Sequence, residues 1–136
     1  MYSIRKRGDY LKYEPKMEKE MMCPIEYGLD IFGGKWKSRI LCVLSSQKVM
    51  RYSQIRKELN NITDAVLAAM LKEMTADELI TRKQYNEIPP KVEYTLTAKG
   101  NSVLPILQTI CQWSRLQTKD ELEKKLPTCK NCSQLP

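Results

Sequence analysis

The chain has 136 residues, of which 42% are hydrophobic and 29% are charged, and its formal net charge is +7. This length and composition predict a single globular domain and exclude a disordered chain. No apolar run reaches the ~18 residues that a membrane span requires, and the basic start of the chain lacks the apolar stretch of a secretory signal. We therefore expect a cytoplasmic protein without a membrane partner. The positive charge favours a polyanionic partner such as nucleic acid.

The sequence contains no histidine and five cysteines. The lack of histidine removes the usual acid–base catalyst and the most common metal ligand, so we expect neither an enzyme nor a bound cofactor. In a cytosolic chain the cysteines are expected to be reduced thiols. Cys42 and Cys111 fall on apolar helix faces and are expected to be small core residues.

Three segments of the chain differ in composition. Residues 1–22 are polar and charged and are expected to form an arm, residues 23–118 carry the periodic apolar pattern of an ordered domain, and residues 119–136 form a polar tail. At the start of the domain, Pro24 suits the first position of a helix. The pair Gly33-Gly34 is expected to end that helix.

Three more helices are predicted before the apolar pattern changes. The second is expected to start at Lys35, the third to span residues 51–59, and Thr63 to cap the fourth after a turn at Asn60-Asn61. Apolar residues at helical spacing are expected to face the core. In the second helix these are Trp36, Ile40, Val43 and Leu44, and in the fourth they are Leu67, Met70, Leu71 and Met74.

An alternating pattern then predicts a β-hairpin, with strands at 79–86 and 91–97 joined by a tip that contains Pro89-Pro90. Thr97 is expected to cap a long last helix over residues 98–118, in which Pro105 should produce a kink. Four helices, a hairpin and a further helix are the order of a winged helix-turn-helix domain. We therefore predict an α+β fold that is mostly α, with a β-hairpin wing and a long C-terminal helix for dimerisation.

The fourth helix is predicted to be the recognition helix of this domain. Its outward side is made of small residues and one lysine, which allows close approach to base edges in the major groove. The residues on this side are Ala65, Ala68, Ala69 and Lys72, with Thr63 and Asp64 at the N-terminus. Alanine methyls can contact thymine methyls and Asp64 can accept from cytosine, so modest direct readout is expected. The alternative is that this side packs against protein.

Most of the affinity for DNA is expected from contacts to phosphates, which are independent of base sequence. The residues predicted to make them are Arg51, Tyr52, Ser53, Lys57 and Lys72. The hairpin adds polar and basic residues that a wing would place over a flanking minor groove or the DNA backbone, namely Arg82, Lys83, Gln84 and Lys91. The alternative for the hairpin is a solvated face without a partner.

The last predicted helix is apolar on two adjacent sides. One stripe contains Leu104, Leu107, Cys111 and Ser114, and the other contains Val103, Ile106, Ile110 and Trp113. A monomer of this size covers one stripe, so we expect the second to form a homodimer interface. The alternative is a helix that is buried deeply in its own domain.

Thiol chemistry is predicted at two places. Cys23 precedes Pro24 at the start of the first helix, where the positive end of a helix dipole favours the reactive thiolate. The alternative is a structural cysteine. Cys129 and Cys132 form a CxxC pair in the tail, which suits a redox couple, half of a zinc site or ordinary tail cysteines. A thioredoxin-like enzyme is disfavoured because no βαβ unit surrounds this pair.

Residues 23–118 resemble the HxlR-type family of bacterial winged-helix transcription regulators, within the broader MarR-like group. The resemblance rests on motifs that occur in the same order as in the family. They are Cys23-Pro24-Ile25-Glu26, Gly33-Gly34-Lys35-Trp36, Arg51-Tyr52-Ser53-Gln54-Ile55, Ile62-Thr63, Leu67, Leu71, Leu79-Ile80, Arg82, Tyr85, Pro89-Pro90, Val92-Glu93-Tyr94, Leu96-Thr97, Gly100 and Trp113.

The resemblance implies a homodimer that binds a palindromic operator in double-stranded DNA. It also implies that the first and last helices form the dimer interface, which places Ile25 there. Family members whose first helix begins with a cysteine, as at Cys23, often sense oxidants or electrophiles through that thiol. We therefore expect a transcriptional repressor that is switched by modification of Cys23. Two alternatives are a winged-helix regulator controlled by a non-covalent small ligand and a thiol redox protein that uses Cys129 and Cys132.

Overall fold

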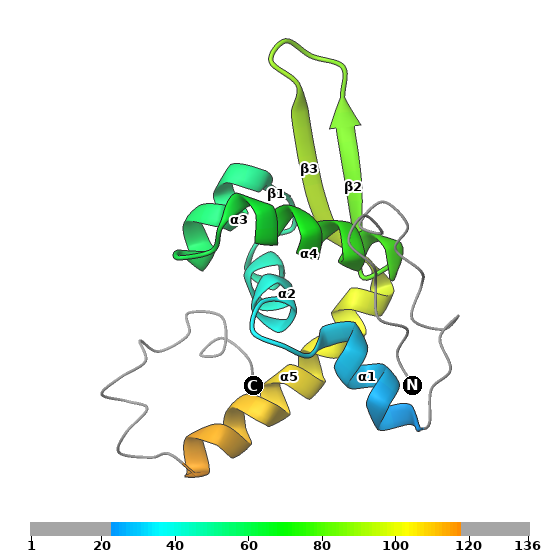
Figure 1. Cartoon of the computed structure of the whole chain (residues 1–136), viewed down its shortest axis with the longest axis vertical. Helices are drawn as coiled ribbons and strands as arrows, with labels where there is room; N and C mark the ends of the chain where they lie inside the picture. Colours follow the sequence, from blue (N-terminus) through cyan, green and yellow to red (C-terminus); the bar gives the residue numbers. More distant parts are fainter. Residues whose placement is uncertain (1–22, 118–136) are drawn as a thin grey trace.

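The computed structural model describes residues 23–117, and the predicted N-terminal arm and CxxC tail lie outside the described residues. In this part of the chain, helices and strands follow the order of a winged helix-turn-helix domain (Figure 1). Their bounds are α1 Pro24–Phe32, α2 Lys37–Ser46, β1 Met50–Arg51, α3 Tyr52–Leu59, α4 Asp64–Ala76, β2 Ile80–Tyr85, β3 Lys91–Leu96 and α5 Ala98–Gln117. The predicted fold class is therefore confirmed.

The helices form two groups that meet at α2. Figure 1 shows α3 and α4 on one side of α2, with the hairpin of β2 and β3 projecting away from the helices, and α1 and α5 on the other side. α2 packs against both α3 and α5, and α4 packs against β2. The helix-turn-helix therefore rests on the same central helix as the long last helix.

The core lies where α2, α3 and α4 meet the base of the sheet. Its largest fully buried side chains are Ile40, Leu41, Met50, Ile55, Leu59, Leu67, Leu71, Met74, Leu79 and Ile80. Burial of each such apolar side chain contributes ~1.5–3 kcal/mol to folding. Met70, which was also predicted to face inward, is only half-buried and packs at the edge of this core.

The sheet has a third strand that the sequence did not predict. β1 pairs with β3 in antiparallel register, with Met50 opposite Tyr94 and Arg51 opposite Glu93, and the strand order is β1-β3-β2. The third helix was expected to begin at residue 51, but Arg51 has extended backbone and α3 begins one residue later. Burial of Met50 beside Tyr94 holds this short segment against the wing.

The second helix begins at Lys37 rather than at the predicted Lys35. Gly34 has a φ of +89°, which glycine adopts at little cost, so the chain is still turning where the helix was expected to start. Trp36 stands at the N-cap of α2 and is half-buried. The Lys35 ammonium and the Arg39 guanidinium lie 4.7 Å and 4.9 Å from its ring centroid, so the indole stacks with two cations.

The predicted N-caps of α4 and α5 are present. Thr63 Oγ1 accepts a hydrogen bond from the Val66 amide at 3.2 Å at the start of α4. Thr97 Oγ1 accepts from the Gly100 amide at 3.0 Å at the start of α5. Each cap satisfies an amide that the first turn of a helix leaves without an intrahelical partner. α5 then runs as one helix through Pro105.

Two lysines join α1 to the recognition helix α4. Lys37 is 6% exposed, and its Nζ atom lies 2.8 Å from Glu73 Oε2 on α4 and donates to the Asp30 carbonyl oxygen on α1 at 3.4 Å. One turn farther along, at the C-cap of α4, Lys99 Nζ donates to the Tyr27 hydroxyl at 3.1 Å and to the Asp77 carbonyl oxygen at 3.0 Å. These polar contacts fix where α4 lies relative to α1.

Gly100 allows α5 to approach the start of β2. It is buried, and a β-carbon at this position would overlap the carbonyl oxygen of Leu79. That oxygen accepts from the Thr97 amide at 3.0 Å and from Thr97 Oγ1 at 3.0 Å, so it cannot move without loss of the α5 cap. The close contact therefore ties the last helix to the wing.

We predict that Gly100→Ala lowers the free energy of unfolding by about 1–3 kcal/mol, because overpacking of this contact forces the backbone apart. Gly28→Ala is the matched control, since a β-carbon there lies 3.5 Å from Phe32 Cε1 in ordinary contact. In that helix, alanine should stabilise the protein by about 0.5–1 kcal/mol. Urea unfolding followed by circular dichroism measures both changes. Equal effects of the two substitutions would contradict the proposed close contact.

Candidate nucleic-acid interface

The helix-turn-helix consists of α3 and α4 and the turn between them. Asn60 and Asn61 have φ values of 49° and 40°, a left-handed conformation that asparagine tolerates better than most residues. Ile62 is 5% exposed and fixes the end of the turn in the core. The turn predicted from Asn60-Asn61 is therefore present, and it delivers Thr63 to the N-cap of α4.

The outward side of α4 has the small residues that the sequence predicted. Ala65, Ala68 and Lys72 are exposed, whereas Ala69 is half-buried and less accessible than expected. Leu67, Leu71 and Met74 cover the opposite side and are buried. Apart from Asp64 at its start, the first two turns of the outward side carry only alanines, so a base edge can approach the helix backbone there.

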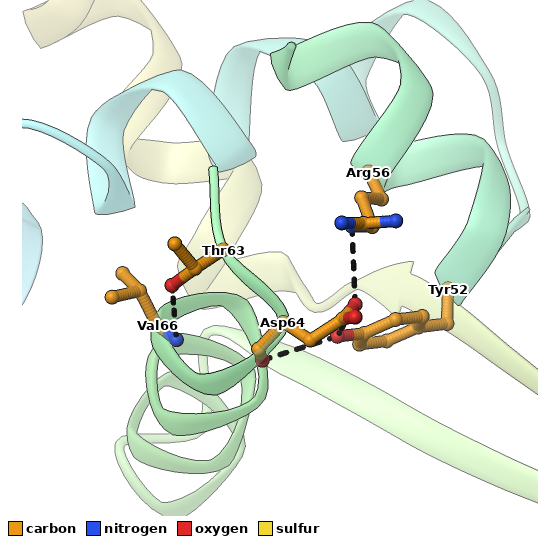
Figure 2. A network of polar contacts seen from close by, with 5 residues as sticks. All are labelled: Tyr52, Arg56, Thr63, Asp64 and Val66. Carbon is orange, nitrogen blue, oxygen red and sulfur yellow. Dashed lines mark hydrogen bonds and ion pairs between the residues drawn. The ribbon is translucent and has the colours of Figure 1, made fainter. Parts of the chain in front are cut away.

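A polar network joins the start of α4 to α3 (Figure 2). The Tyr52 hydroxyl donates to Asp64 Oδ1 at 3.0 Å and also lies 3.2 Å from the Asp64 carbonyl oxygen. Arg56 Nε lies 3.1 Å from the same Oδ1 atom. Burial raises the pKa of the Tyr52 phenol, and the hydrogen bond to the Asp64 carboxylate raises it further. The hydroxyl of Tyr52 is thus already bonded within the protein, which was not expected of a phosphate ligand.

Arg56 is the residue of this site that sequence reasoning missed. It lies one helical turn after Tyr52, so both side chains reach the same carboxylate from one face of α3. The spacing of four residues between Tyr52 and Arg56 indicates that they share one face of the helix. The sequence does not show that Asp64 lies opposite this face, because that depends on the conformation of the turn. The other predicted phosphate ligands on this helix and before it, Arg51, Ser53 and Lys57, are all exposed.

The wing carries its predicted polar and basic side chains in a compact cluster. Lys83 Nζ and Lys91 Nζ each lie 4.9 Å from the ring centroid of Tyr85. Lys91 Nζ also lies 2.9 Å from Glu93 Oε1, and the Tyr85 hydroxyl donates to Glu93 Oε2 at 3.1 Å. Glu93 therefore offsets part of the positive charge of the wing and holds Lys91 in place.

Two further residues complete the polar edge of β2. Arg82 Nη1 donates to Gln84 Oε1 at 3.3 Å, and both side chains are exposed. At the hairpin tip between the strands, Ile88 is fully exposed. The wing therefore presents cations along its strands and an apolar side chain at its end.

The exposed apolar residues lie mainly on α1 and α5. On α1 these are Ile25 and Leu29, and on α5 they are Ile106, Ile110, Trp113 and Leu116. Val103 was predicted to belong to the same stripe, but it is 6% exposed and packs in the core of its own chain with Leu107. The α5 stripe, here defined as Ile106, Ile110 and Trp113, is therefore the part that a partner can contact.

The three cysteines of the described segment differ in accessibility. Cys23 is exposed and stands at the N-cap of α1, directly before Pro24. Cys42 and Cys111 are half-buried. No membrane-spanning helix and no cluster of potential metal ligands occurs between residues 23 and 117. The predicted pair Cys129 and Cys132 lies outside the described residues.

A helix-turn-helix with a small-residue recognition face and a basic wing defines a winged-helix regulator that binds DNA. The sequence pattern of the HxlR-like helix-turn-helix family matches residues 31–129. The chain therefore belongs to the HxlR-like helix-turn-helix family. Its curated relatives are described as transcriptional regulators, a class of protein that acts through DNA binding rather than catalysis.

One such relative is an uncharacterized HTH-type transcriptional regulator of Methanothermobacter thermautotrophicus, 43% identical over 97 residues that cover 71% of this chain and 73% of the relative. Among solved structures, the redox regulator HypR in its oxidized form is 35% identical, with a TM-score of 0.63 over 68% of this chain and 95% of HypR. The reduced form of the transcriptional regulator YodB from Bacillus subtilis is 33% identical, with a TM-score of 0.62 over 70% of this chain and 93% of YodB.

We predict that acid weakens the wing through Glu93. The hydrogen bond from Lys91 lowers the pKa of this carboxyl, with a smaller contribution from the Tyr85 hydroxyl. The stabilisation is present above the usual carboxyl pKa and is lost as the pH falls through the lowered value. Carbon-detected NMR titration should show a midpoint below that of an unperturbed glutamate. Lys91→Gln should raise the midpoint more than Tyr85→Phe does, and the reverse order would contradict this assignment.

Proposed function

We propose that this regulator is a repressor, that it binds a palindromic operator as a homodimer, and that modification of Cys23 releases it from DNA. The observation that carries the proposal is the connection between α1, whose N-cap is the exposed Cys23, and the recognition helix α4. Lys37 and Lys99 make this connection at the C-terminal end of α4, through Glu73 and the C-cap residue Asp77. A change at the start of α1 therefore has a physical route to the DNA-binding helix.

The proposed DNA contacts are divided between phosphates and bases. Exposed residues of α3 and its N-cap, Arg51, Ser53 and Lys57, contact phosphates that flank the major groove. The outward alanines of α4 lie against base edges, and Lys72 reaches the backbone farther along that helix. The wing residues Arg82, Lys83, Gln84 and Lys91 lie over the adjacent minor groove.

The proposed dimer interface uses the α5 stripe together with Ile25 and Leu29 of α1. Trp113 is 63% exposed and Ile25 is 72% exposed in the isolated chain, so burial of both against a partner gains apolar area. A two-fold symmetric dimer presents two copies of α4, which enter major grooves about 34–36 Å apart on one side of the duplex. This spacing depends on how α1 and α5 meet their counterparts.

The proposed switch follows from the same geometry. An oxidant or an electrophile converts the Cys23 thiol to a larger or cross-linked sulfur at the N-cap of α1. The altered end of α1 changes the packing of the dimer, and the lysine contacts carry that change to α4. A small rotation of the two recognition helices then breaks the match to operator spacing. The relationship to the redox regulator HypR supports this reading of Cys23.

We predict that the reduced protein binds the DNA upstream of its own gene and that diamide or N-ethylmaleimide weakens this binding by about tenfold, within the 5–150-fold range of typical allosteric couplings. Fluorescence anisotropy measures the affinity. Cys23→Ser should bind as tightly as the wild type and ignore both reagents, while Cys42→Ser, a change at a half-buried thiol, should respond like the wild type. An equal response of the wild type and Cys23→Ser would exclude the proposed switch.

We predict that Ile110→Asp raises the dissociation constant of the dimer by more than tenfold, because a charge replaces an apolar side chain at the centre of the interface. Sedimentation equilibrium of the full-length protein measures this constant. Gln112→Asp is the matched control, since Gln112 is exposed on α5 but lies outside the stripe. A dimer that tolerates Ile110→Asp as well as Gln112→Asp would place the interface elsewhere.

A further inference from the structure

The first residue of the recognition helix is held by the helix before it. Asp64 begins α4, and its Oδ1 atom receives both the Tyr52 hydroxyl and Arg56 Nε from α3 (Figure 2). The Asp64 side chain is nevertheless 66% exposed, because both donors approach from one side. Both side-chain contacts to the carboxylate fall on Oδ1, so Oδ2 is the oxygen that remains for a further hydrogen bond.

A carboxylate at this position would ordinarily oppose DNA binding. The N-terminus of a recognition helix lies deepest in the major groove, between two rows of phosphates. An unpaired negative charge there is repelled by the phosphates, whereas the Arg56 guanidinium balances the charge at a distance of 3.1 Å. The ion pair therefore lets an acceptor enter the groove at a lower electrostatic cost than a lone aspartate.

We propose that Tyr52 and Arg56 are positioning residues that hold Asp64 as a fixed hydrogen-bond acceptor for the exocyclic amine of a cytosine in each operator half-site. The proposal rests on the proposed binding of DNA and deepens it by assigning one specificity-determining contact. Tyr52 and Arg56 do not touch the base. They orient the carboxylate before DNA binds. Contact between Oδ2 and the base therefore costs little additional side-chain entropy.

The chemistry of the base edges selects cytosine over the other three bases. Guanine and thymine present acceptor oxygens at the corresponding edge, and these repel a carboxylate. Adenine presents an amine, but its neighbouring N7 atom is a second acceptor. Cytosine presents its N4 amine without an adjacent acceptor, so it is the base that an acceptor-only group fits best.

The competing explanation is a purely structural role for Asp64. An acidic residue in the first turn of a helix interacts favourably with the helix dipole, and this alone would account for an aspartate there. A structural role predicts lower stability on substitution but no change of base preference. The two explanations are therefore separated by base preference and not by affinity alone.

The experiment is a selection of binding sites by the full-length protein from a library of random duplexes, followed by affinity measurement on the selected site with each base pair varied in turn. The wild type should enrich a two-fold symmetric site with cytosine at one position of each half-site and should lose affinity about tenfold when this cytosine is replaced. Asp64→Ala should relax this position alone. Lys57→Gln, a change at an exposed proposed phosphate ligand, should weaken all sites uniformly and leave every base preference intact.

A second variant tests whether Tyr52 and Arg56 orient the side chain at position 64. In Asp64→Asn the carbonyl oxygen remains the partner of the two donors, Tyr52 and Arg56, so the amide nitrogen occupies the place of Oδ2. A donor then replaces an acceptor, and the preference at the same position should change from cytosine to guanine or thymine. Tyr52→Phe and Arg56→Gln should keep a preference for cytosine but reduce its magnitude. Circular dichroism and thermal unfolding establish that each variant is folded.

The outcomes separate the two proposals. A wild-type protein that enriches no sequence would overturn the proposed operator binding and this inference together. Enrichment of a site whose base preferences survive in Asp64→Ala and Asp64→Asn would overturn this inference alone. Relaxation at one position in Asp64→Ala, with inversion in Asp64→Asn, would establish Asp64 as the reader of that position.

Discussion

The arrangement of this domain depends on a buried ammonium group. Lys37 lies at the start of α2, and its Nζ atom is held between the carboxylate of Glu73 on α4 and the Asp30 carbonyl oxygen on α1. A lone charge in this position would be strongly unfavourable, so the three helices must stay where these partners meet it. Apolar packing alone gives little direction along a helix axis, because leucine and isoleucine contacts tolerate sliding. The ion pair supplies that direction and fixes the recognition helix against the rest of the protein.

The same constraint joins the helix-turn-helix to the first and last helices. Lys99 lies near the start of α5, and its contacts reach both α1 and the C-terminal end of α4. Gly100 follows it and brings α5 into contact with the chain just before β2. The recognition helix, the wing and the long last helix therefore share anchoring points within a few residues of one another. A displacement of either α1 or α5 therefore changes the position of the helix-turn-helix.

Periodicity predicted the helices and the hairpin well, because apolar residues at helical or alternating spacing are set by the need to cover one core. Local capping chemistry was also readable, as Thr63 and Thr97 show. The short strand β1 could not be predicted, because two residues are too few to show an alternating pattern. It is defined only by its pairing with β3. Helical spacing assigned Val103 to the exposed stripe of α5, but this residue is buried. The two apolar stripes of α5 are adjacent, and the sequence does not show which of them packs against α2. The contacts of Tyr52 and Arg56 with Asp64 could not be predicted, because they depend on how the turn between α3 and α4 folds. The residue types in the turn indicate that a turn forms but do not fix the distance between the two helices.

The two tryptophans of the sequence lie at the start of α2 and on the last helix. Trp36 is half-buried beside two cations at the N-cap of α2, and Trp113 is exposed on α5. Their environments differ so much that their ultraviolet emission is separable: the indole in water emits at longer wavelength and is open to collisional quenchers, while the stacked one is shielded. The native protein thus carries two optical reporters, one at the start of α2 and one on the last helix, and both can be followed without any attached dye.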